Sequence, residues 1–300
     1  MCRVDEFADY LLKERQYSKH TVIAYVVDVR QFCEFCKIEG NDVEFAKITI
    51  KDVRAWLAME MRAKRGGESG LSAASGKRKL SSLRAFFRFL EKKGVVENNP
   101  VENLTGPKVN KRLPVFVRED VMGDVLEEME GVGGFSGLRD RLIILLIYET
   151  GVRRSELLGL RVRDFDFHRS CLRVLGKGDK EREIPMLREL AQEVQVYLEM
   201  REELVGGQHD IFFVTDKGRP IYGQFVYRLV RKVLADDVSL ERRSPHVLRH
   251  TFATHLLNNG ASIEGIKDLL GHASVGTTQV YAHNTVERMK KIFNQAHPRA

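Results

Sequence analysis

Residues 244–281 concentrate side chains that bind anions or transfer protons. The stretch opens with a Ser-Pro pair, which predicts a helix start, because serine caps free N–H groups and proline is tolerated at the first helical position. His246, Arg249 and His250 then lie one turn apart on one face of that helix. Since the N–H groups at a helix N-terminus add positive potential, this arrangement predicts an anion-binding site.

Two further helices are expected before the stretch ends. Gly260 and Gly271 predict helix ends, because glycine accepts the left-handed conformation that follows a last turn, and Ser262 predicts the N-cap between them. His272 follows the second end directly, and a third helix carries Tyr281. The side chains of the first helix that we expect to face the core are Phe252, Leu256 and Leu257.

Histidines at mixed spacing also suggest a metal site as an alternative. Zinc sites need clustered Cys or His ligands, and the sequence contains neither an H-E-x-x-H motif nor paired C-x-x-C motifs. Cys33 and Cys36 form an isolated C-x-x-C on a predicted helix, and the four cysteines make no disulfide framework. The sequence therefore predicts reduced cysteines and no metal.

The joint pattern is more specific than any of its parts. It consists of H-x-x-R-H, then L-L-G-H, then a tyrosine nine residues after that histidine. This pattern resembles the signature of the tyrosine recombinases, the phage integrase family. The resemblance is closest to the Xer branch, the XerC- and XerD-like site-specific recombinases, and it covers essentially the whole chain, down to the final H-P-R-A.

The resemblance implies two arginines that bind the scissile phosphate. The segment T-G-V-R-R-S-E-L follows a predicted buried helix and matches the family pattern T-G-L-R-x-S-E-L, which makes Arg153 the first of them. Arg154 stands where relatives usually carry an apolar residue. Glu156, one turn further, is expected to orient an arginine, and Arg249 supplies the second guanidinium.

The resemblance also implies proton donors and supporting groups. Lys177 stands between two glycines at the tip of a predicted hairpin, and in the family the matching lysine protonates the departing 5′ oxygen, with Lys180 as the alternative here. His246 transfers a proton, His272 donates a hydrogen bond to the scissile phosphate, and His250 supports the site.

Tyr281 is the nucleophile that the resemblance implies. A free phenol has a pKa of about 10, so it needs a cationic pocket and a base to lose its proton at neutral pH. The product is a 3′-phosphotyrosine, which keeps the energy of the phosphodiester bond. Rejoining therefore needs no ATP, and no Walker A motif is present. No cofactor is implied.

Charge and composition agree with a nucleic-acid partner. The 300 residues carry a net charge of +7 with a pI of about 9.2, which favours a polyanion. Residues 62–93 hold ten Lys or Arg against two Glu and include a predicted helix whose core stripe is Leu83, Phe86, Phe87 and Leu90. The residues expected to lie off that stripe and reach DNA phosphates are Lys77, Arg84, Arg88 and Lys92.

We expect a mainly α protein with a small antiparallel β-sheet. The resemblance makes residues 1–106 a helical, SAM-like core-binding domain that clamps DNA, 107–114 a linker, and 115–300 the catalytic domain with a C-terminal tail. The helices expected from periodicity and caps are 3–15, 18–40, 50–65, 72–93, 118–130, 138–149, 153–160, 187–204 and 222–236. A hairpin is expected at 171–186, and a further strand at 210–215.

The function expected first is site-specific recombination of double-stranded DNA that resolves chromosome dimers at cell division. The resemblance adds a homo-tetramer, or a hetero-tetramer with a paralogue, held through the tail 288–300, and activation by the cell-division DNA translocase. No run of apolar residues approaches the ~20 that a membrane helix needs, and the N-terminus lacks a secretory pattern, so a cytoplasmic location is expected. The alternatives are a mobile-element integrase, a catalytically silent DNA-binding regulator and a type IB topoisomerase.

Overall fold

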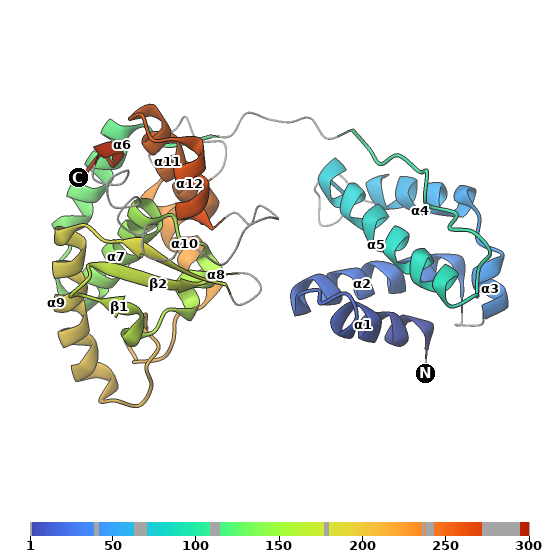
Figure 1. The fold of residues 1–300 in the computed structure, drawn as a ribbon, viewed down its shortest axis with the longest axis horizontal. Helices are drawn as coiled ribbons and strands as arrows, with labels where there is room; N and C mark the ends of the chain where they lie inside the picture. The colour runs from blue at the N-terminus through green and yellow to red at the C-terminus, as the bar shows by residue number, and fades with distance from the viewer. Residues whose placement is uncertain are drawn as a thin grey trace. The chain divides into compact units, whose positions relative to one another are not determined.

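The computed structural model describes residues 2–38, 42–62, 71–108, 115–176, 180–235, 237, 243–271 and 295–299. The chain divides into two compact units, Met1–Arg112 and Leu113–Ala300 (Figure 1). The expected linker, 107–114, lies mostly outside the described residues. In the described ranges no helix combines the length and the hydrophobicity that spanning a membrane requires.

The regular elements in the described part of the first unit are all helices. Its helices are α1 (Arg3–Lys13), α2 (Lys19–Cys36), α3 (Asp42–Ala46), α4 (Ile50–Arg62) and α5 (Ala73–Lys92). The predicted core stripe of α5 is confirmed, because all four of its side chains are fully buried. The ring of Phe86 meets the rings of Phe7 and Phe45 edge to face, with centroids 5.2 and 5.4 Å apart. Edge-to-face pairs of this kind add to the stabilisation from burial, so α5 forms the centre of this unit.

In this unit one predicted helix end was wrong and one short helix was missed. The helix expected over 18–40 ends at Cys36, because Lys37 adopts a left-handed backbone with φ of 54°. Its start was right, since the Ser18 hydroxyl accepts the N–H of Thr21 at 3.2 Å. The short helix α3 was not predicted, because five residues are too few to show a helical period.

The second unit is built around α7 (Gly134–Thr150), whose residues from Leu142 to Thr150 are all buried. Helices α6 (Glu119–Glu130), α9 (Arg188–Val205) and α11 (Pro245–Asn258) pack against it. This unit also contains α8 (Arg154–Gly159), α10 (Gly223–Val233), α12 (Ile263–Leu270) and the short 3-10 helix η1 (Val162–Asp164). On α11, Phe252 and Leu256 are buried as expected, but Leu257 is 47% exposed, so its assignment to the core was wrong.

A three-stranded antiparallel sheet lies beside these helices (Figure 1). Its strands are β1 (Phe165–Asp166), β2 (Cys171–Leu175) and β3 (Glu181–Pro185), in that spatial order. Val174 pairs with Arg182 and Arg173 with Glu183. Because successive residues of a strand point to opposite faces, Arg182 faces the helices while Glu183 faces away from them. The sheet and the helices confirm the predicted fold class.

The strand predicted over 210–215 is absent from this sheet. Only isolated bridges form there, from Ile211 and Val214. Side chains of α9 take the backbone groups that a ladder would use: the Tyr197 hydroxyl donates to the carbonyl of Phe212 at 3.2 Å, and Arg201 donates to the carbonyl of Ile211 at 2.7 Å. The apolar run is therefore buried without pairing as a strand.

The last described residues, 295–299, pack against α7 and α11. Asn259 donates to the carbonyl of Ala296 at 3.0 Å, and Arg299 pairs with Glu149 at 2.5 Å. Burial raises the pKa of the Glu149 carboxyl to about 7, although Arg299 opposes that shift. The docked end of the tail thus contacts the buried helix at the centre of the unit.

Candidate active site

Three arginines and one glutamate meet at one end of α12. We call Arg153, Glu156, Arg182 and Arg249 the arginine cluster. Arg153 caps the N-terminus of α8, Glu156 lies in the first turn of α8, Arg182 lies in β3 and Arg249 lies in α11. Segments distant in sequence therefore supply four charged side chains to one place, with a formal charge of +2.

Each arginine donates to a different carbonyl at the end of α12. Arg182 Nε donates to the carbonyl of Leu269 at 3.1 Å, and Arg249 Nη2 donates to that of Leu270 at 2.7 Å. Arg153 Nη2 donates to the carbonyl of Gly271 at 3.3 Å. These carbonyls carry the partial negative charge of a helix C-terminus, so the arginines satisfy the end of α12 without neutralising their own charge.

Glu156 connects two of the arginines. Its Oε1 accepts from Arg153 Nη1 at 2.7 Å and from Arg182 Nη1 at 3.0 Å, while its Oε2 accepts from Arg182 Nη2 at 2.8 Å and from the backbone N–H of Arg153 at 2.7 Å. Burial would raise the pKa of this carboxyl, but the hydrogen bonds from Arg182 and from the Arg153 backbone lower it to about 2. Glu156 is therefore a fixed negative charge that orients both guanidinium groups.

Arg249 is the most enclosed arginine of the cluster, with 8% of its surface exposed. Besides Leu270, it donates to the carbonyl of Gly151. Burial, and then the neighbouring charge of Arg153, lower its guanidinium pKa to about 10. A guanidinium in this environment gains from an added negative charge, because its own charge is poorly solvated.

Position 151, just before Arg153, requires a glycine. Its φ of +60° is left-handed, and a side-chain carbon there would lie 2.6 Å from the Phe252 ring and 2.8 Å from Leu270. The chain can therefore turn from α7 towards Arg153, and present its carbonyl to Arg249, only with glycine at this position.

The structure brings together three of the predicted site residues: Arg153, Glu156 and Arg249. Arg154, the alternative to Arg153, is exposed on the first turn of α8. His246 is exposed at the start of α11. His250, half-buried one turn later, lies 3.5 Å from the Thr254 hydroxyl through Nε2, and burial lowers its pKa.

Lys177, His272 and Tyr281 lie outside the described residues. The described chain nevertheless reaches the arginine cluster at two points. One is Gly271, whose carbonyl binds Arg153. The other is Gly176, where a side-chain carbon would lie 3.6 Å from Arg182 Nη1 and 3.9 Å from Glu156 Oε1. Gly176 also donates its N–H to the carbonyl of the exposed Lys180 at 2.8 Å, which holds the two sides of the hairpin together.

Two residues with clear structural roles were missed from the sequence. Arg182 is one, although its place between Glu181 and Glu183 on an alternating strand is a signal that it faces inward. The other is His255, for which the motifs suggest no role. Its Nδ1 lies 3.0 Å from the Tyr148 hydroxyl and its Nε2 2.9 Å from the carbonyl of Val117. His255 thus joins α11 to α7 and to the start of the second unit.

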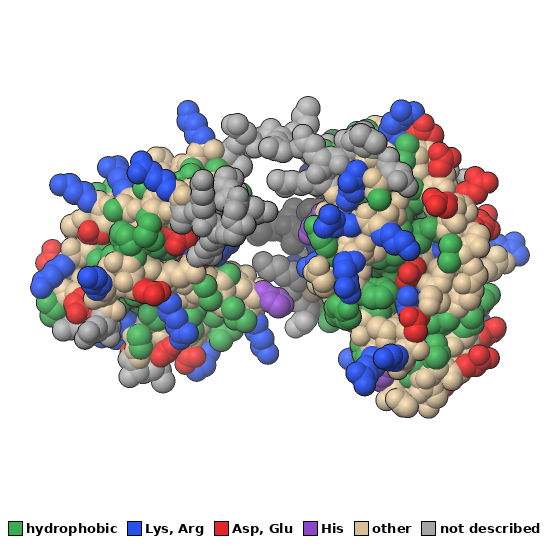
Figure 2. Space-filling model, turned by 180° about the vertical axis from the view of Figure 1, so that it is seen from behind, with side chains coloured by type: hydrophobic (Ala, Val, Ile, Leu, Met, Phe, Trp, Pro, Cys, Tyr) green, Lys and Arg blue, Asp and Glu red, His purple; other side chains and the backbone are tan. Residues whose placement is uncertain are grey.

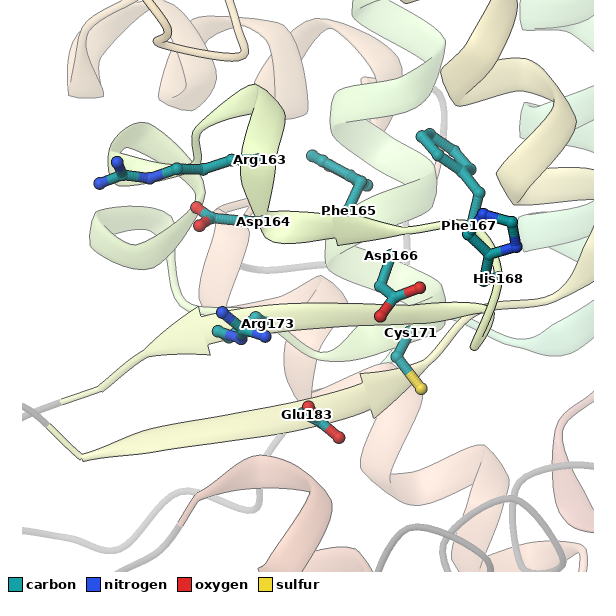
Figure 3. Close-up of a pocket in the computed structure, with 9 residues that line it drawn as sticks. All are labelled: Arg163, Asp164, Phe165, Asp166, Phe167, His168, Cys171, Arg173 and Glu183. Carbon is teal, nitrogen blue, oxygen red and sulfur yellow. The ribbon is translucent and has the colours of Figure 1, made fainter.

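A hollow of about 420 Å³ lies on the opposite face of the sheet (Figure 3). It is open and lined by both signs of charge, including Arg173, Asp166 and Glu183. Glu183 is already paired with Arg169 at 2.8 Å. The arginine cluster lies on the other face, so this hollow is separate from it.

Three of the four basic residues predicted to bind DNA from α5 are engaged within their own unit. Arg84 is not a free side chain, because it donates to the carbonyl of Leu104 at 2.8 Å and helps to fix the segment after α5. Arg88 pairs with Glu102 at 2.5 Å, and Lys92 pairs with Glu14 at 2.7 Å. Lys77 is exposed.

Lys and Arg side chains are spread over the visible face of the first unit and do not form one patch (Figure 2). Exposed ion pairs such as those of Arg88 and Lys92 contribute little to stability. Both side chains can therefore exchange a carboxylate for a phosphate, whereas the polar end of Arg84 belongs to the fold.

Comparison with known proteins identifies the family. The model of the phage integrase family matches residues 116–288, and that of the N-terminal SAM-like domain of phage integrases matches residues 4–94. The chain belongs to the phage integrase family of site-specific tyrosine recombinases. The predicted resemblance is confirmed, and with it the assignment to enzymes that cut and rejoin DNA.

Relatives that align with the whole chain are tyrosine recombinases named XerC. The chain is 37% identical to the tyrosine recombinase XerC of Pelobacter propionicus, covering all of this chain and 96% of the relative. It is 36% identical to XerC of Staphylococcus carnosus, with 100% and 99% covered, and 34% identical to XerC of Chlorobaculum tepidum, with 100% and 95% covered.

Solved structures share the fold. A XerH site-specific recombinase bound to palindromic difH substrate, in a post-cleavage complex, matches with a TM-score of 0.70 and 24% identity over 96% of this chain and 83% of that one. The integrase of transposon Tn1549 in complex with circular intermediate DNA matches with a TM-score of 0.66 and 21% identity over 96% and 99%.

Proposed function

We propose that this recombinase resolves chromosome dimers in the cytoplasm at cell division. The choice of this role rests on the full-length similarity to XerC recombinases, and the observation that carries the cleavage chemistry is the charge of the arginine cluster. Arg153 and Arg182 share the carboxylate of Glu156, and the hydrogen bonds of Arg249 within the described residues go to neutral carbonyls. The excess of two positive charges suits a phosphodiester, whose non-bridging oxygens gain negative charge in the transition state.

In the proposed reaction, Tyr281 attacks the scissile phosphorus. Its phenol proton passes to His246, a bond forms between the tyrosine oxygen and phosphorus, and the bond from phosphorus to the 5′ oxygen breaks. Lys177 protonates that departing oxygen. Arg153, Arg249 and His272 hold the non-bridging oxygens, and Glu156 and His250 support them. Reversal of these steps with a 5′ hydroxyl of the partner strand rejoins DNA, so the bond energy is conserved.

Proximity in sequence supports the placement of two of these groups. Lys177 follows Gly176, and His272 follows Gly271, and both glycines lie at the arginine cluster. A general acid acts only within hydrogen-bond reach of the atom that it protonates. The hairpin and the end of α12 are therefore suited to bring an acid and a hydrogen-bond donor to the same phosphate.

The partners proposed are duplex DNA and other copies of a recombinase. The unit of residues 1–106 clamps the DNA, with Lys77, Arg88 and Lys92 binding phosphates. Four subunits, either identical or shared with a paralogue, assemble through the tail 288–300. Within one subunit, the end of that tail contacts α7 through the ion pair of Arg299 with Glu149. Activation by the cell-division DNA translocase completes the proposal.

The test is covalent capture on DNA. Nicked duplexes tiled across the replication terminus of the source genome are incubated with the wild-type protein and with Tyr281→Phe. The proposal predicts a protein–DNA adduct on one terminus sequence, formed by the wild type and absent in the variant. An adduct on mobile-element ends alone would support the integrase alternative. Adducts on every duplex, with resealing and no strand exchange, would indicate a topoisomerase, and binding without any adduct a silent regulator.

A further inference from the structure

We propose that Arg182 is a positioning residue for the recombination reaction. It joins Glu156, and through Glu156 the phosphate-binding Arg153, to the C-terminal end of α12. The inference rests on the proposed role of the arginine cluster. Arg182 is assigned no contact with the substrate, because its polar atoms are already bound to other groups of the protein.

The hydrogen bonds of Arg182 go in two directions. Both of its terminal nitrogens bind the carboxylate of Glu156, one to each oxygen, at 3.0 and 2.8 Å. Its Nε donates to the carbonyl of Leu269 at 3.1 Å. A guanidinium offers five N–H groups in a fixed plane, so one side chain holds a carboxylate and a helix end at a defined angle. A lysine can reproduce the charge but not this fork.

The stem of Arg182 also supports the two points where the described chain reaches the cluster. At Gly271, whose φ is +61°, a side-chain carbon would lie 3.0 Å from Arg182 Cδ. At Gly176 the corresponding position lies 3.6 Å from Arg182 Nη1. The side chain of Arg182 is 10% exposed and that of Glu156 5%. Both glycine segments are therefore packed against one enclosed, rigidly held guanidinium.

The charge of Glu156 depends on this ion pair. Burial opposes ionisation of the Glu156 carboxyl, and the hydrogen bond from Arg182 is the leading influence that keeps its pKa low. Without Arg182, its hydrogen bond and its charge no longer oppose burial, so the carboxyl pKa rises. Because a protonated Glu156 no longer holds Arg153 by charge, cleavage is then lost at a higher pH as the solution is acidified. A purely structural role for Arg182 would leave unchanged the pH at which cleavage is lost on acidification, the acid limb of the pH–rate profile.

The first experiment measures single-turnover cleavage of the duplex that the wild type captures. Arg182→Gln is expected to slow cleavage about 10²-fold, the cost of misplacing a reacting group by about 1 Å, with the dissociation constant for the duplex unchanged. Arg182→Lys should recover part of the rate, because it restores the charge beside Glu156. Glu183→Gln is the matched control: it lies on the same strand, faces away and forms a surface ion pair, and it should cleave like the wild type.

The second experiment asks whether Arg182 acts through Glu156. In a double-mutant cycle, Arg182→Gln combined with Glu156→Gln should be no slower than the slower single variant, because both changes break the same ion pair. Multiplying effects would show that Arg182 acts independently. Wild-type cleavage by Arg182→Gln, with an unmoved acid limb, would overturn the inference as well.

A readout without DNA separates this inference from the proposed function. The carboxyl ¹³C resonance of Glu156 is titrated in the wild type and in Arg182→Gln, and the midpoint is expected to rise in the variant. An unchanged midpoint contradicts the inference whatever the DNA experiments give. Failure of the wild type to capture any duplex contradicts the proposed function instead, even where the midpoint rises.

Discussion

Each unit of the chain contains a cluster of basic side chains around buried carboxylates, and the charges of the two clusters are balanced differently. In the first unit, Lys79 pairs with Glu60 at 3.2 Å and Arg78 binds both oxygens of Asp28. Asp28 also accepts from the Ser82 hydroxyl at 2.7 Å. Two cations thus meet two carboxylates. In the arginine cluster of the second unit, three cations meet one carboxylate.

The difference shows which cluster is suited to a charged ligand. A balanced cluster has no net charge that could attract a ligand, and buried pairs of that kind specify or stabilise a fold. The arginine cluster leaves two positive charges bound to carbonyls of Gly151 and the end of α12. Carbonyl dipoles satisfy hydrogen bonds but do not cancel a charge. We therefore infer that a phosphate completes the second cluster and would add nothing to the first.

The largest expected effect separates proton transfer from charge stabilisation. Lys177→Ala should slow cleavage of a normal site by about 10²–10⁴-fold, the usual contribution of a general acid. On a duplex whose bridging 5′ oxygen is replaced by sulfur, the leaving group needs no proton, and the variant should be largely rescued. Arg249→Ala should stay slow on both substrates, because the phosphate charge remains. Equal impairment of Lys177→Ala on the two would move the assignment to Lys180.

The balanced cluster is tested by removing one partner. Lys79→Met should lower the free energy of unfolding by about 3–5 kcal/mol, because it leaves the enclosed carboxylate of Glu60 without its partner. Urea denaturation measures this decrease. Cleavage by the remaining folded protein should match the wild type. A cleavage defect out of proportion to the unfolded fraction would show that this cluster also serves the reaction.

Variants of the arginine cluster should lose cleavage activity and not stability. Arg153→Ala or Arg249→Ala should slow cleavage by about 10²–10³-fold, the typical effect of removing one preorganised charge-stabilising donor. The exposed Arg154 provides the matched control on α8. Single-turnover rates decide between the neighbours: a large defect in Arg154→Ala together with a normal rate in Arg153→Ala would shift the assigned position by one residue.

The smallest effect concerns DNA affinity. Replacing Lys77, Arg88 and Lys92 by glutamine should weaken binding on every sequence. It should also reduce the slope of log affinity against log salt by about 0.9 for each phosphate that the protein no longer neutralises. Arg84→Gln is expected instead to lower stability, since it removes a bond to the carbonyl of Leu104. An unchanged slope in the triple variant would remove α5 from the DNA interface.

Periodicity and caps predicted much of the fold because those signals are local. The apolar run of α7 and the stripe of α5 determined two buried helices, and Ser262 and Gly271 enclose α12 as expected. The segment 210–215 was misjudged because side chains of α9 bind the carbonyls of Ile211 and Phe212. Packing between distant elements leaves no periodic trace in a sequence.

In the candidate site, too, local signals were predicted from the sequence and contacts between distant elements were not. The resemblance to the family predicted Arg153, Glu156 and Arg249 as site residues, but it gave no reason to connect them with the end of α12 or with Arg182. Their meeting depends on the packing of α8, α11, α12 and β3. Conversely, the basic run of α5 suggested free side chains, whereas Arg84 binds the backbone of its own unit. Composition gives the number of charged residues, and only the fold shows which of them already bind other groups of the protein.

The most direct test of the account removes the charge from the substrate instead of from the protein. A methylphosphonate at the scissile position replaces one charged non-bridging oxygen by a methyl group, so an arginine that only stabilises phosphate charge becomes dispensable. Covalent capture is measured for the wild type and for Arg249→Ala on the phosphodiester and on the methylphosphonate. The account predicts a defect of about 10²–10³-fold on the phosphodiester and near wild-type capture on the methylphosphonate. The same defect on both substrates would contradict the claim that the arginine cluster acts on the charge of the phosphate.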